Sequence, residues 1–200
     1  MEPKIAILGS VLNGGACQIL DAAYPKYKNE NFFLYDDEAT LITDSYLNVP
    51  IRGGIEQAFI DYKNKKITHF VVGVCSLPAR STIFQNAINH GINSINIVSN
   101  KSIVSRSISI GKGNIILPNT YIGPNVIIGN NNYITCGSNI NHDTKIDNNN
   151  YFSTCVAIAG RVIIGSNIRF GTNSAVTACT KVPSDSLIKD GEIFGFQRGR

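Results

Sequence analysis

Hydrophobic residues follow two different patterns along the chain, and the change falls near residue 100. Before it, four short apolar runs, at 4–9, 31–37, 68–75 and 94–99, alternate with three stretches of helical character, at 15–24, 55–64 and 78–90. Continuous apolar strands that alternate with helices predict a parallel sheet covered on both faces. We therefore expect residues 1–100 to form one α/β domain of the Rossmann-like type.

After residue 100 the apolar residues recur every six positions. From Val104 to Val182, all fourteen residues at this spacing are apolar, and glycine directly follows several of them. A period of six fits a prism with three flat sides, in which each hexad forms one side and its apolar residue points inward. Glycine, or asparagine from tracts such as 130–132 and 148–150, is expected at the corners, where φ must be positive. Residues 101–200 are thus predicted to form an all-β left-handed parallel β-helix of hexapeptide repeats, which ends after Val182 and is followed by a short C-terminal tail.

The composition narrows the class of protein. Of the 200 residues, 43% are hydrophobic and 16% are charged, which excludes a disordered, highly charged chain. The net charge of +4 suits an anionic small ligand, whereas the scattered basic residues and the lack of a shared aromatic platform argue against nucleic acid. No apolar stretch is long enough for a membrane span, and residues 1–10 do not resemble a secretory signal, so we expect a cytoplasmic protein without membrane contact.

The cysteines give no indication of a metal or a disulfide framework. They are odd in number and widely spread, and no pair has C-x-x-C spacing. We expect free, buried thiols in a reducing compartment at all five positions, which are Cys17, Cys75, Cys136, Cys155 and Cys179.

One histidine stands out in the repeat region. His142 lies two residues after the apolar Ile140 and is followed by Asp143, so its side chain should point outward near a corner of the prism. A neighbouring carboxylate can orient an imidazole and increase its basicity, which makes the pair a candidate general base with its orienting partner. The alternative is a solvated surface pair. We expect His69 and His90 to be structural.

A glycine-containing turn, residues 9–15, follows the first predicted strand. Its backbone N–H groups and the helix N-terminus after it can receive an anionic phosphate, which makes Gly9, Asn13 and Gly14 candidate substrate-binding residues. Asp36 and Asp37 end the second strand and are candidates for the same substrate. An acidic pair after a strand also forms an ordinary turn, and this alternative stays open.

The order of the two domains resembles one family over essentially the whole chain: the sugar O-/N-acyltransferases typified by the bacillosamine-pathway N-acetyltransferase and the sialic acid O-acetyltransferase. The most specific stretch is 140–160, INHDTKIDNNNYFSTCVAIAG, where a histidine is followed by an acidic residue and an Ala-Gly pair precedes another hexad. The resemblance implies a homotrimer with acetyl-coenzyme A in the cleft between neighbouring β-helices. It also implies that the N-terminal domain holds a nucleotide-linked sugar.

The resemblance also implies roles for individual residues. His142 becomes the catalytic base, and Gly160, the glycine of the Ala-Gly pair, becomes the main-chain N–H donor to the thioester oxygen. Asp36 and Asp37 come to lie near the base or ribose of the nucleotide.

The chain departs from the family pattern in two places. The turn at 9–15 lacks the histidine of the family's G-x-S-G-H-G turn, and its second glycine is displaced, which leaves the nucleotide open. The C-terminal sequence differs as well. Arg198 and Arg200 are candidates to bind the phosphates of coenzyme A, with a frayed basic tail as the alternative.

Together these features predict an acetyltransferase that transfers acetyl from acetyl-coenzyme A to the amino group of a nucleotide-linked 4-amino-4,6-dideoxy sugar, with UDP as the favoured nucleotide. Direct attack on a thioester requires a positioned base and no metal. Two alternatives stay open: O-acetylation of a sialic-acid-like sugar, and a non-catalytic trimeric scaffold that binds sugar nucleotides. The length of the acyl chain is open too.

Overall fold

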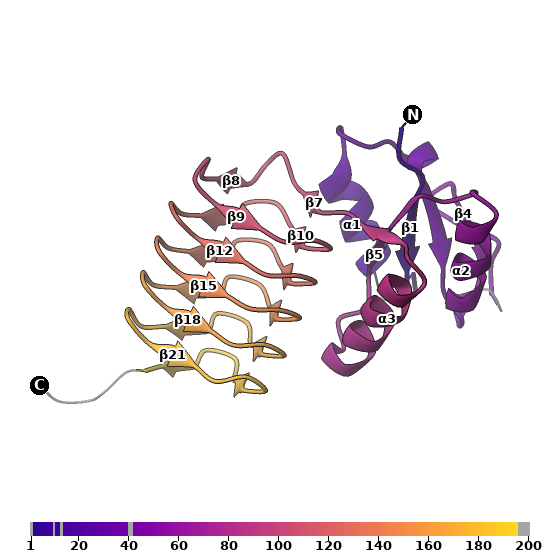
Figure 1. Cartoon of the computed structure of the whole chain (residues 1–200). Helices are drawn as coiled ribbons and strands as arrows, with labels where there is room; N and C mark the ends of the chain where they lie inside the picture. Colours follow the sequence, from indigo (N-terminus) through magenta and orange to yellow (C-terminus); the bar gives the residue numbers. More distant parts are fainter. Residues whose placement is uncertain (1, 10, 13, 40–41, 196–200) are drawn as a thin grey trace, which may run out of the picture. The chain divides into compact units, whose positions relative to one another are not determined.

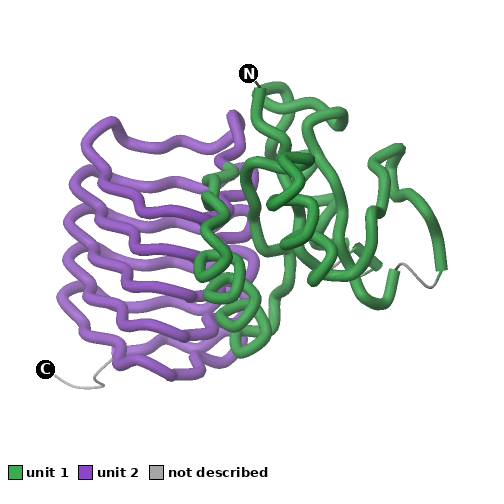
Figure 2. Tube along the Cα trace, turned by 45° about the vertical axis from the view of Figure 1, so that its right-hand side comes forward, with its two compact units in different colours: residues 1–97 green, residues 98–200 purple. Residues whose placement is uncertain are grey.

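The computed structural model describes residues 2–9, 11, 12, 14–39 and 42–195. The chain forms two compact units that divide between Ile97 and Val98 (Figure 2). Each unit has its own cluster of buried hydrophobic residues. Within the described residues, none of the helices has the length and apolar character that crossing a membrane requires.

Unit 1 contains a six-stranded sheet with the strand order β3-β4-β2-β1-β5-β6 (Figure 1). The parallel strands are β1 (Ile5–Leu8), β2 (Phe32–Tyr35), β4 (Val49–Gly53), β5 (His69–Val72) and β6 (Asn93–Ser94), and β3 (Ser45–Tyr46) is antiparallel to β4. The connections contain α1 (Gly15–Ala23), the 3-10 helix η1 (Asn29–Asn31), α2 (Ile55–Lys63) and α3 (Leu77–Asn89).

The strands and helices of unit 1 form because their apolar side chains can be buried. All four residues of β1 are buried, as a strand covered on both faces requires. Helix α1 buries Ala16, Ile19, Leu20 and Ala23, which follow the i, i+3, i+4, i+7 spacing of one helix face. The prediction of a single strand at 94–99 is wrong. The segment splits into β6 and β7, because Val98 lies six residues before Val104 and so belongs to the series of apolar residues spaced by six.

Unit 2 consists of two-residue strands in three parallel sheets, an arrangement that fits the predicted left-handed β-helix. The first sheet holds β7 (Ile97–Val98), β10 (Ile115–Ile116), β13 (Tyr133–Ile134), β16 (Tyr151–Phe152), β19 (Arg169–Phe170) and β22 (Leu187–Ile188). The second holds β8 (Ile103–Val104), β11 (Tyr121–Ile122), β14 (Asn139–Ile140), β17 (Ala157–Ile158), β20 (Ala175–Val176) and β23 (Ile193–Phe194). The third holds β9 (Ser109–Ile110), β12 (Ile127–Ile128), β15 (Lys145–Ile146), β18 (Ile163–Ile164) and β21 (Lys181–Val182).

The six-residue apolar frame forms the core of unit 2, as predicted. Strands pair with those eighteen residues away, so that Ile122 aligns with Ile140 and Ile140 with Ile158, and each of these side chains is buried. Phe152 and Phe170 stack with their ring centroids 4.5 Å apart. The predicted end after Val182 is wrong. The β-helix continues through β22 and β23, because Ile188 and Phe194 extend the same frame.

The corners of the β-helix differ from the prediction in how glycine is used. A left-handed φ occurs at the third residue after the apolar position, and asparagine fills many of these places, including Asn119, Asn125 and Asn131. Five glycines directly after the apolar residues lack this conformation: Gly111, Gly123, Gly129, Gly165 and Gly171. At Gly123 a Cβ would lie 2.9 Å from the backbone nitrogen of His142 in the next coil, so glycine is needed there for close stacking of the coils.

The expectation of five buried thiols is wrong. Cys155 and Cys179 are exposed, and Cys17, Cys75 and Cys136 are half-buried. The two exposed cysteines occupy left-handed corner positions, with φ of 60° and 59°, where the side chain cannot enter the prism. The corner geometry therefore decides their exposure.

Candidate functional site

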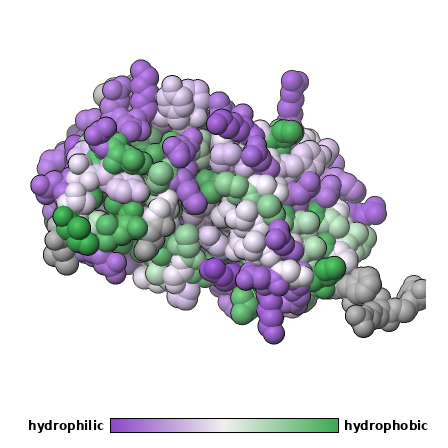
Figure 3. All heavy atoms as spheres, turned by 180° about the vertical axis from the view of Figure 1, so that it is seen from behind, coloured by the Kyte–Doolittle hydropathy of each residue, from purple (hydrophilic) through white to green (hydrophobic). Residues whose placement is uncertain are grey.

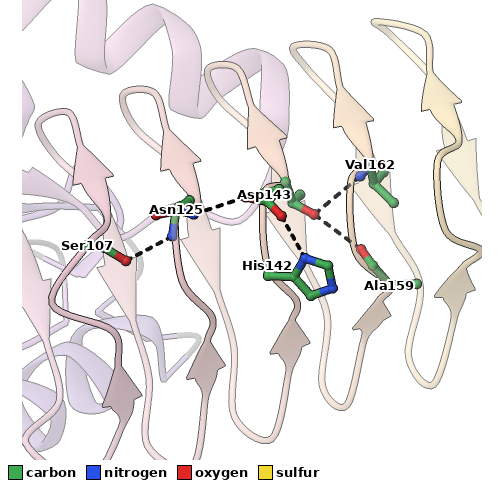
Figure 4. A network of polar contacts seen from close by, with 7 residues as sticks. Ser107, Asn125, His142, Asp143, Ala159 and Val162 are labelled. Carbon is green, nitrogen blue, oxygen red and sulfur yellow. Dashed lines mark hydrogen bonds and ion pairs between the residues drawn. The ribbon is translucent and has the colours of Figure 1, made fainter.

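His142 and Asp143 form a hydrogen-bonded pair in the turn between β14 and β15. The His142 Nδ1 atom lies 2.8 Å from Asp143 Oδ2, and the two side chains are 50% and 46% exposed (Figure 4). The left-handed corner at Asp143, with φ 58°, turns the carboxylate toward the preceding imidazole. Both side chains are thus accessible to a ligand, and the hydrogen bond between them fixes their relative orientation.

The second carboxylate oxygen of Asp143 is bound from the previous coil. Asn125, eighteen residues earlier, donates from Nδ2 to Asp143 Oδ1 at 3.1 Å, and its own backbone N–H donates to Ser107 Oγ at 3.0 Å (Figure 4). The hydrogen bond with His142 and then that from Asn125 lower the pKa of Asp143. An ionised carboxylate only accepts hydrogen bonds, so Nδ1 of His142 carries the proton and Nε2 of the neutral ring is left as an acceptor.

Gly160 lies one coil beyond His142, in the turn between β17 and β18. A Cβ on Gly160 would be 2.7 Å from His142 Nε2 and 2.8 Å from Cε1, so the imidazole occupies the space that a side chain would need. The turn is fixed by Thr144, which donates to the Ala159 carbonyl at 3.1 Å and accepts from the Val162 N–H at 3.3 Å (Figure 4).

The backbone N–H of Gly160 lacks the side-chain acceptor that some equivalent positions in other coils have. Asn130 and Asn148 stand at the same place in their hexads, and each N–H donates to a side-chain oxygen eighteen residues further on. For Gly160 that residue is Ala178, which has no acceptor in its side chain. Among the described residues no acceptor is found for the Gly160 N–H, which leaves it available to a ligand beside Nε2 of His142.

A separate cavity lies in unit 1, at the carboxyl ends of β1, β2 and β5. This carboxyl-edge cavity has a volume of about 550 Å³ and is lined by Gly9, Asp36, Asp37, Glu38, Ile55, Val74, Cys75 and Ser76. Gly9 has φ 77°, and a Cβ there would be 2.5 Å from Val74 Cγ2, so only glycine fits. Gly14 begins α1 and is not among the described lining residues, and Asn13 lies outside the described residues.

The two aspartates after β2 are both engaged by backbone N–H groups. Asp36 is buried and accepts from Val11 at 2.9 Å, Glu38 at 3.0 Å and Ala39 at 2.8 Å. Asp37 Oδ1 accepts from the Ile55 N–H at 3.0 Å, at the start of α2. Asp36 therefore fixes the loops around the cavity, as the turn interpretation expects, while both residues still line it.

The structure brings His142, Asp143 and Gly160 together on one edge of unit 2. It brings Gly9, Asp36 and Asp37 together in unit 1. Arg198 and Arg200 lie outside the described residues. The functional roles of these residues stay predictions.

Sequence reasoning did not single out two further residues at these sites. Asn125 could have been found, because it precedes Asp143 by eighteen residues, the length of one coil. Arg80 in α3 is fully buried and donates from Nη1 to the carbonyls of Val72 and Val74, beside the carboxyl-edge cavity. No sequence signal marks it, since an arginine in a helix is usually exposed.

Comparison with known proteins agrees with the fold of the chain. Residues 107–142 match the family model described as bacterial transferase hexapeptide (six repeats). A sequence comparison with curated proteins finds no match.

Two solved structures illustrate the likeness in fold. A histidine variant of GDP-perosamine N-acetyltransferase from Caulobacter crescentus, in complex with CoA and GDP-perosamine, has a TM-score of 0.85 at 20% identity; the match covers 94% of this chain and 86% of that one. The acetyltransferase domain of PglB from Neisseria gonorrhoeae, in complex with acetyl coenzyme A, has a TM-score of 0.84 at 19% identity and coverages of 96% and 94%. The chain thus shares the fold of these two acetyltransferases, and the resemblance found from the sequence is confirmed at that level.

Proposed function

We propose that this protein is an acetyltransferase that transfers acetyl from acetyl-coenzyme A to the amino group of a nucleotide-linked 4-amino-4,6-dideoxy sugar. The observation that carries the proposal is the His142–Asp143 pair, whose free Nε2 lies against Gly160. The likeness in fold to two sugar N-acetyltransferases that bind coenzyme A or acetyl-coenzyme A supports the choice of reaction.

His142 acts as the general base. Asp143 holds the proton on Nδ1, so Nε2 is free to accept a proton from the sugar amine as the amine attacks the thioester carbon. The acetyl thioester supplies an activated carbonyl, so the chain needs no nucleophile of its own and no covalent intermediate. Asp143 stabilises the imidazolium that results. The tetrahedral intermediate then collapses with cleavage of the C–S bond, and coenzyme A leaves as a thiolate that takes up the proton from the imidazolium.

The Gly160 N–H is suited to bind the developing oxyanion. It has no acceptor among the described residues and lies on the same edge of unit 2 as Nε2 of His142. A backbone N–H donor in this position stabilises the negative charge that develops on the thioester oxygen. One removed donor of this type costs about a hundredfold or more in kcat. Arg198 and Arg200 are proposed to bind the phosphates of coenzyme A.

The carboxyl-edge cavity of unit 1 is proposed to bind the nucleotide part of the acceptor. Its position at the carboxyl ends of parallel strands is the usual ligand site of an open α/β sheet, which supports a Rossmann-like role for residues 1–100. The carboxylates of Asp37 and Glu38 suit the hydroxyl groups of a ribose or the N–H groups of a base. The phosphates of the nucleotide are then expected near Gly9, Asn13 and Gly14, which precede α1 in the sequence. UDP is the proposed nucleotide, and GDP is its first competitor because one neighbour binds GDP-perosamine.

The assembly is proposed to be a cytoplasmic homotrimer in which residues 101–200 form the acyltransferase domain. The outward positions of its strands support this, since Ile127 and Ile163 of one sheet are 45% and 48% exposed and Leu187 of another is 64% exposed. Hydrophobic side chains also interrupt the polar surface in Figure 3. Contact with a second copy would cover such side chains.

The test is the release of coenzyme A from acetyl-coenzyme A in the presence of UDP-4-amino-4,6-dideoxy-N-acetylglucosamine, with the GDP-linked amino sugar and sialic acid as further acceptors. We expect turnover by the native chain and a loss of about a hundredfold or more in His142→Ala. His90→Ala, which removes an exposed histidine of unit 1, is the matched control and should retain full activity. Turnover that survives His142→Ala would remove the base assignment, turnover with sialic acid alone would favour O-acetylation, and no turnover with any acceptor would favour a binding scaffold.

A further inference from the structure

A second cavity in unit 1 lies at the opposite edge of the sheet, where β1, β5 and β6 begin. This amino-edge cavity has a volume of about 930 Å³, and its lining includes Pro3 and Lys4 before β1, His69 of β5 and Asn93 of β6. The volume is that of a site for a small molecule. Among the described residues, none of those proposed to take part in acetyl transfer lines it.

The charge of the amino-edge cavity favours an anion. Three lysines line it, Lys4, Lys63 and Lys65, against one carboxylate, that of Glu2. One oxygen of Glu2 is already engaged, because Asn31 donates from Nδ2 to its Oε2 at 3.0 Å. Burial lowers the pKa of His69, so its imidazole is neutral at pH 7 and adds no charge.

Two tyrosine rings give the cavity flat apolar walls. The Tyr62 hydroxyl donates to the Gly91 carbonyl at 2.8 Å, which fixes the direction of its ring. Tyr27 packs edge-to-face against Phe32, with 6.3 Å between the ring centroids. Rings held in this way can stack on a planar ligand with little loss of side-chain entropy.

Lys65 has an unusual backbone conformation at this site. Its φ is 57°, in the left-handed region, and its N–H donates to the Tyr62 carbonyl at 2.9 Å, in the turn that ends α2. Glycine is the usual residue in such a turn, because a residue with a Cβ is strained in this conformation. Outside the corners of the β-helix, only Leu47 and Asn48 share this conformation among the described non-glycine residues. A strained residue whose side chain lines a cavity points to a function for that side chain.

We infer that the amino-edge cavity binds a small ligand that joins a planar ring to phosphate groups, of the nucleotide class, at a site separate from acetyl transfer. The lysines pair with the phosphates, and the ring lies against Tyr27 and Tyr62. The site is formed within unit 1 and does not depend on the proposed acetyltransferase activity.

The inference can be tested by equilibrium dialysis of ADP against the full chain, without acetyl-coenzyme A, whose own adenine ring and phosphates belong to the same ligand class. The test variant is Lys63→Glu/Lys65→Glu. The control is Lys101→Glu/Lys112→Glu, which replaces two exposed lysines of unit 2 and changes the net charge by the same amount. We expect the Kd of ADP to rise at least tenfold in the test variant and less than twofold in the control.

Circular dichroism of both double variants separates a loss of binding from a loss of folding. Inorganic phosphate serves as the competitor without a ring and should displace ADP at least tenfold less well than AMP does. The inference is overturned if the native chain fails to bind ADP, if ADP binds the test variant as it binds the control, or if phosphate competes as well as AMP.

Discussion

The imidazole of His142 lies against Gly160, which follows it by one coil of the β-helix. A Cβ on Gly160 would meet Nε2 at 2.7 Å and Cε1 at 2.8 Å, and the φ of Gly160 is outside the left-handed region. Glycine is therefore required at this position by the space that the ring occupies and not by the backbone conformation. The position of the proposed base depends on the absence of one methyl group.

Gly160→Ala should thus reduce activity while leaving the fold intact. The added methyl group displaces the imidazole, which is half exposed and can rotate into solvent. We expect kcat to fall by about tenfold to a hundredfold and the midpoint of thermal unfolding to change little, since Gly→Ala also reduces the entropy of the unfolded chain. Steady-state kinetics and a thermal melt measure the two effects.

Gly123→Ala is the control for this substitution. There the Cβ would meet the backbone nitrogen of His142 at 2.9 Å, and backbone cannot rotate away. We expect it to lower thermal stability clearly more than Gly160→Ala does. If Gly160→Ala left kcat unchanged, the ring would not need its present position for catalysis.

Asp143→Asn should lower kcat by about tenfold or more with little change in KM for the acceptor. The amide carries no charge and can donate to Nδ1, which would leave the proton on Nε2, the atom proposed to accept it. Because the hydrogen bond with His142 and then that from Asn125 lower the pKa of Asp143, the native carboxylate stays ionised across the range of neutral assays.

Asn125→Gly removes the hydrogen bond to Asp143 Oδ1 and suits the left-handed φ of 59° at this corner, so it should have a smaller effect on kcat than Asp143→Asn. The two variants are compared by measuring the kcat of each from pH 6 to pH 8. An equal loss in both, or none in Asp143→Asn, would contradict the orienting role.

The hydrophobic period of six predicted the β-helix because each apolar residue in the frame has one place to go, the interior. The same reasoning missed its end, because Ile188 and Phe194 continue the frame beyond Val182. Its expectation of asparagine at the corners is confirmed at Asn131 and Asn149, whereas the glycines directly after Ile110, Ile122 and Ile128 do not have the left-handed φ expected of a corner. A period alone does not distinguish a glycine needed for φ from one needed for close stacking.

The candidate site was predictable where neighbours in sequence are neighbours in space. His142 and Asp143 are adjacent, and their hydrogen bond follows from that. The contact of His142 with Gly160 and that of Asp143 with Asn125 join residues eighteen apart and need the coil length as well. The backbone contacts of Asp36 depend on loop conformations that no sequence pattern specifies.

Asn150→Ala should destabilise the β-helix by about 3 kcal/mol, because it leaves two buried backbone groups unpaired. Asn150 is fully buried; its Oδ1 accepts from the Ile168 N–H at 2.8 Å, and its Nδ2 donates to the Gly165 carbonyl at 2.9 Å. Asn130→Ala is the control, since Asn130 is exposed and water can replace its bonds, for a cost below about 1 kcal/mol. Urea unfolding gives both values, and equal losses would contradict the explanation by burial.

Asp61→Asn should make unit 1 less stable at neutral pH and less sensitive to acid. Asp61 is buried, and although burial raises the pKa of its carboxyl, hydrogen bonds from Tyr35, Gln57 and Lys66 lower it on balance. A carboxyl whose pKa is lower in the folded chain stabilises it above the unfolded pKa, near 4, and this stabilisation is lost as the pH falls through the folded value.

We therefore expect the native chain to be more stable than Asp61→Asn by about 2 kcal/mol at pH 7, with the difference shrinking as the pH falls from about 4 toward 2. Urea midpoints measured across this range check the direction. Asp21→Asn, an exposed aspartate in α1, should leave the pH dependence of stability as it is in the native chain. A difference between native and Asp61→Asn that stayed constant or grew in acid would mean that the charge of Asp61 is not what stabilises the fold, since only an ionised carboxylate loses its contribution on protonation.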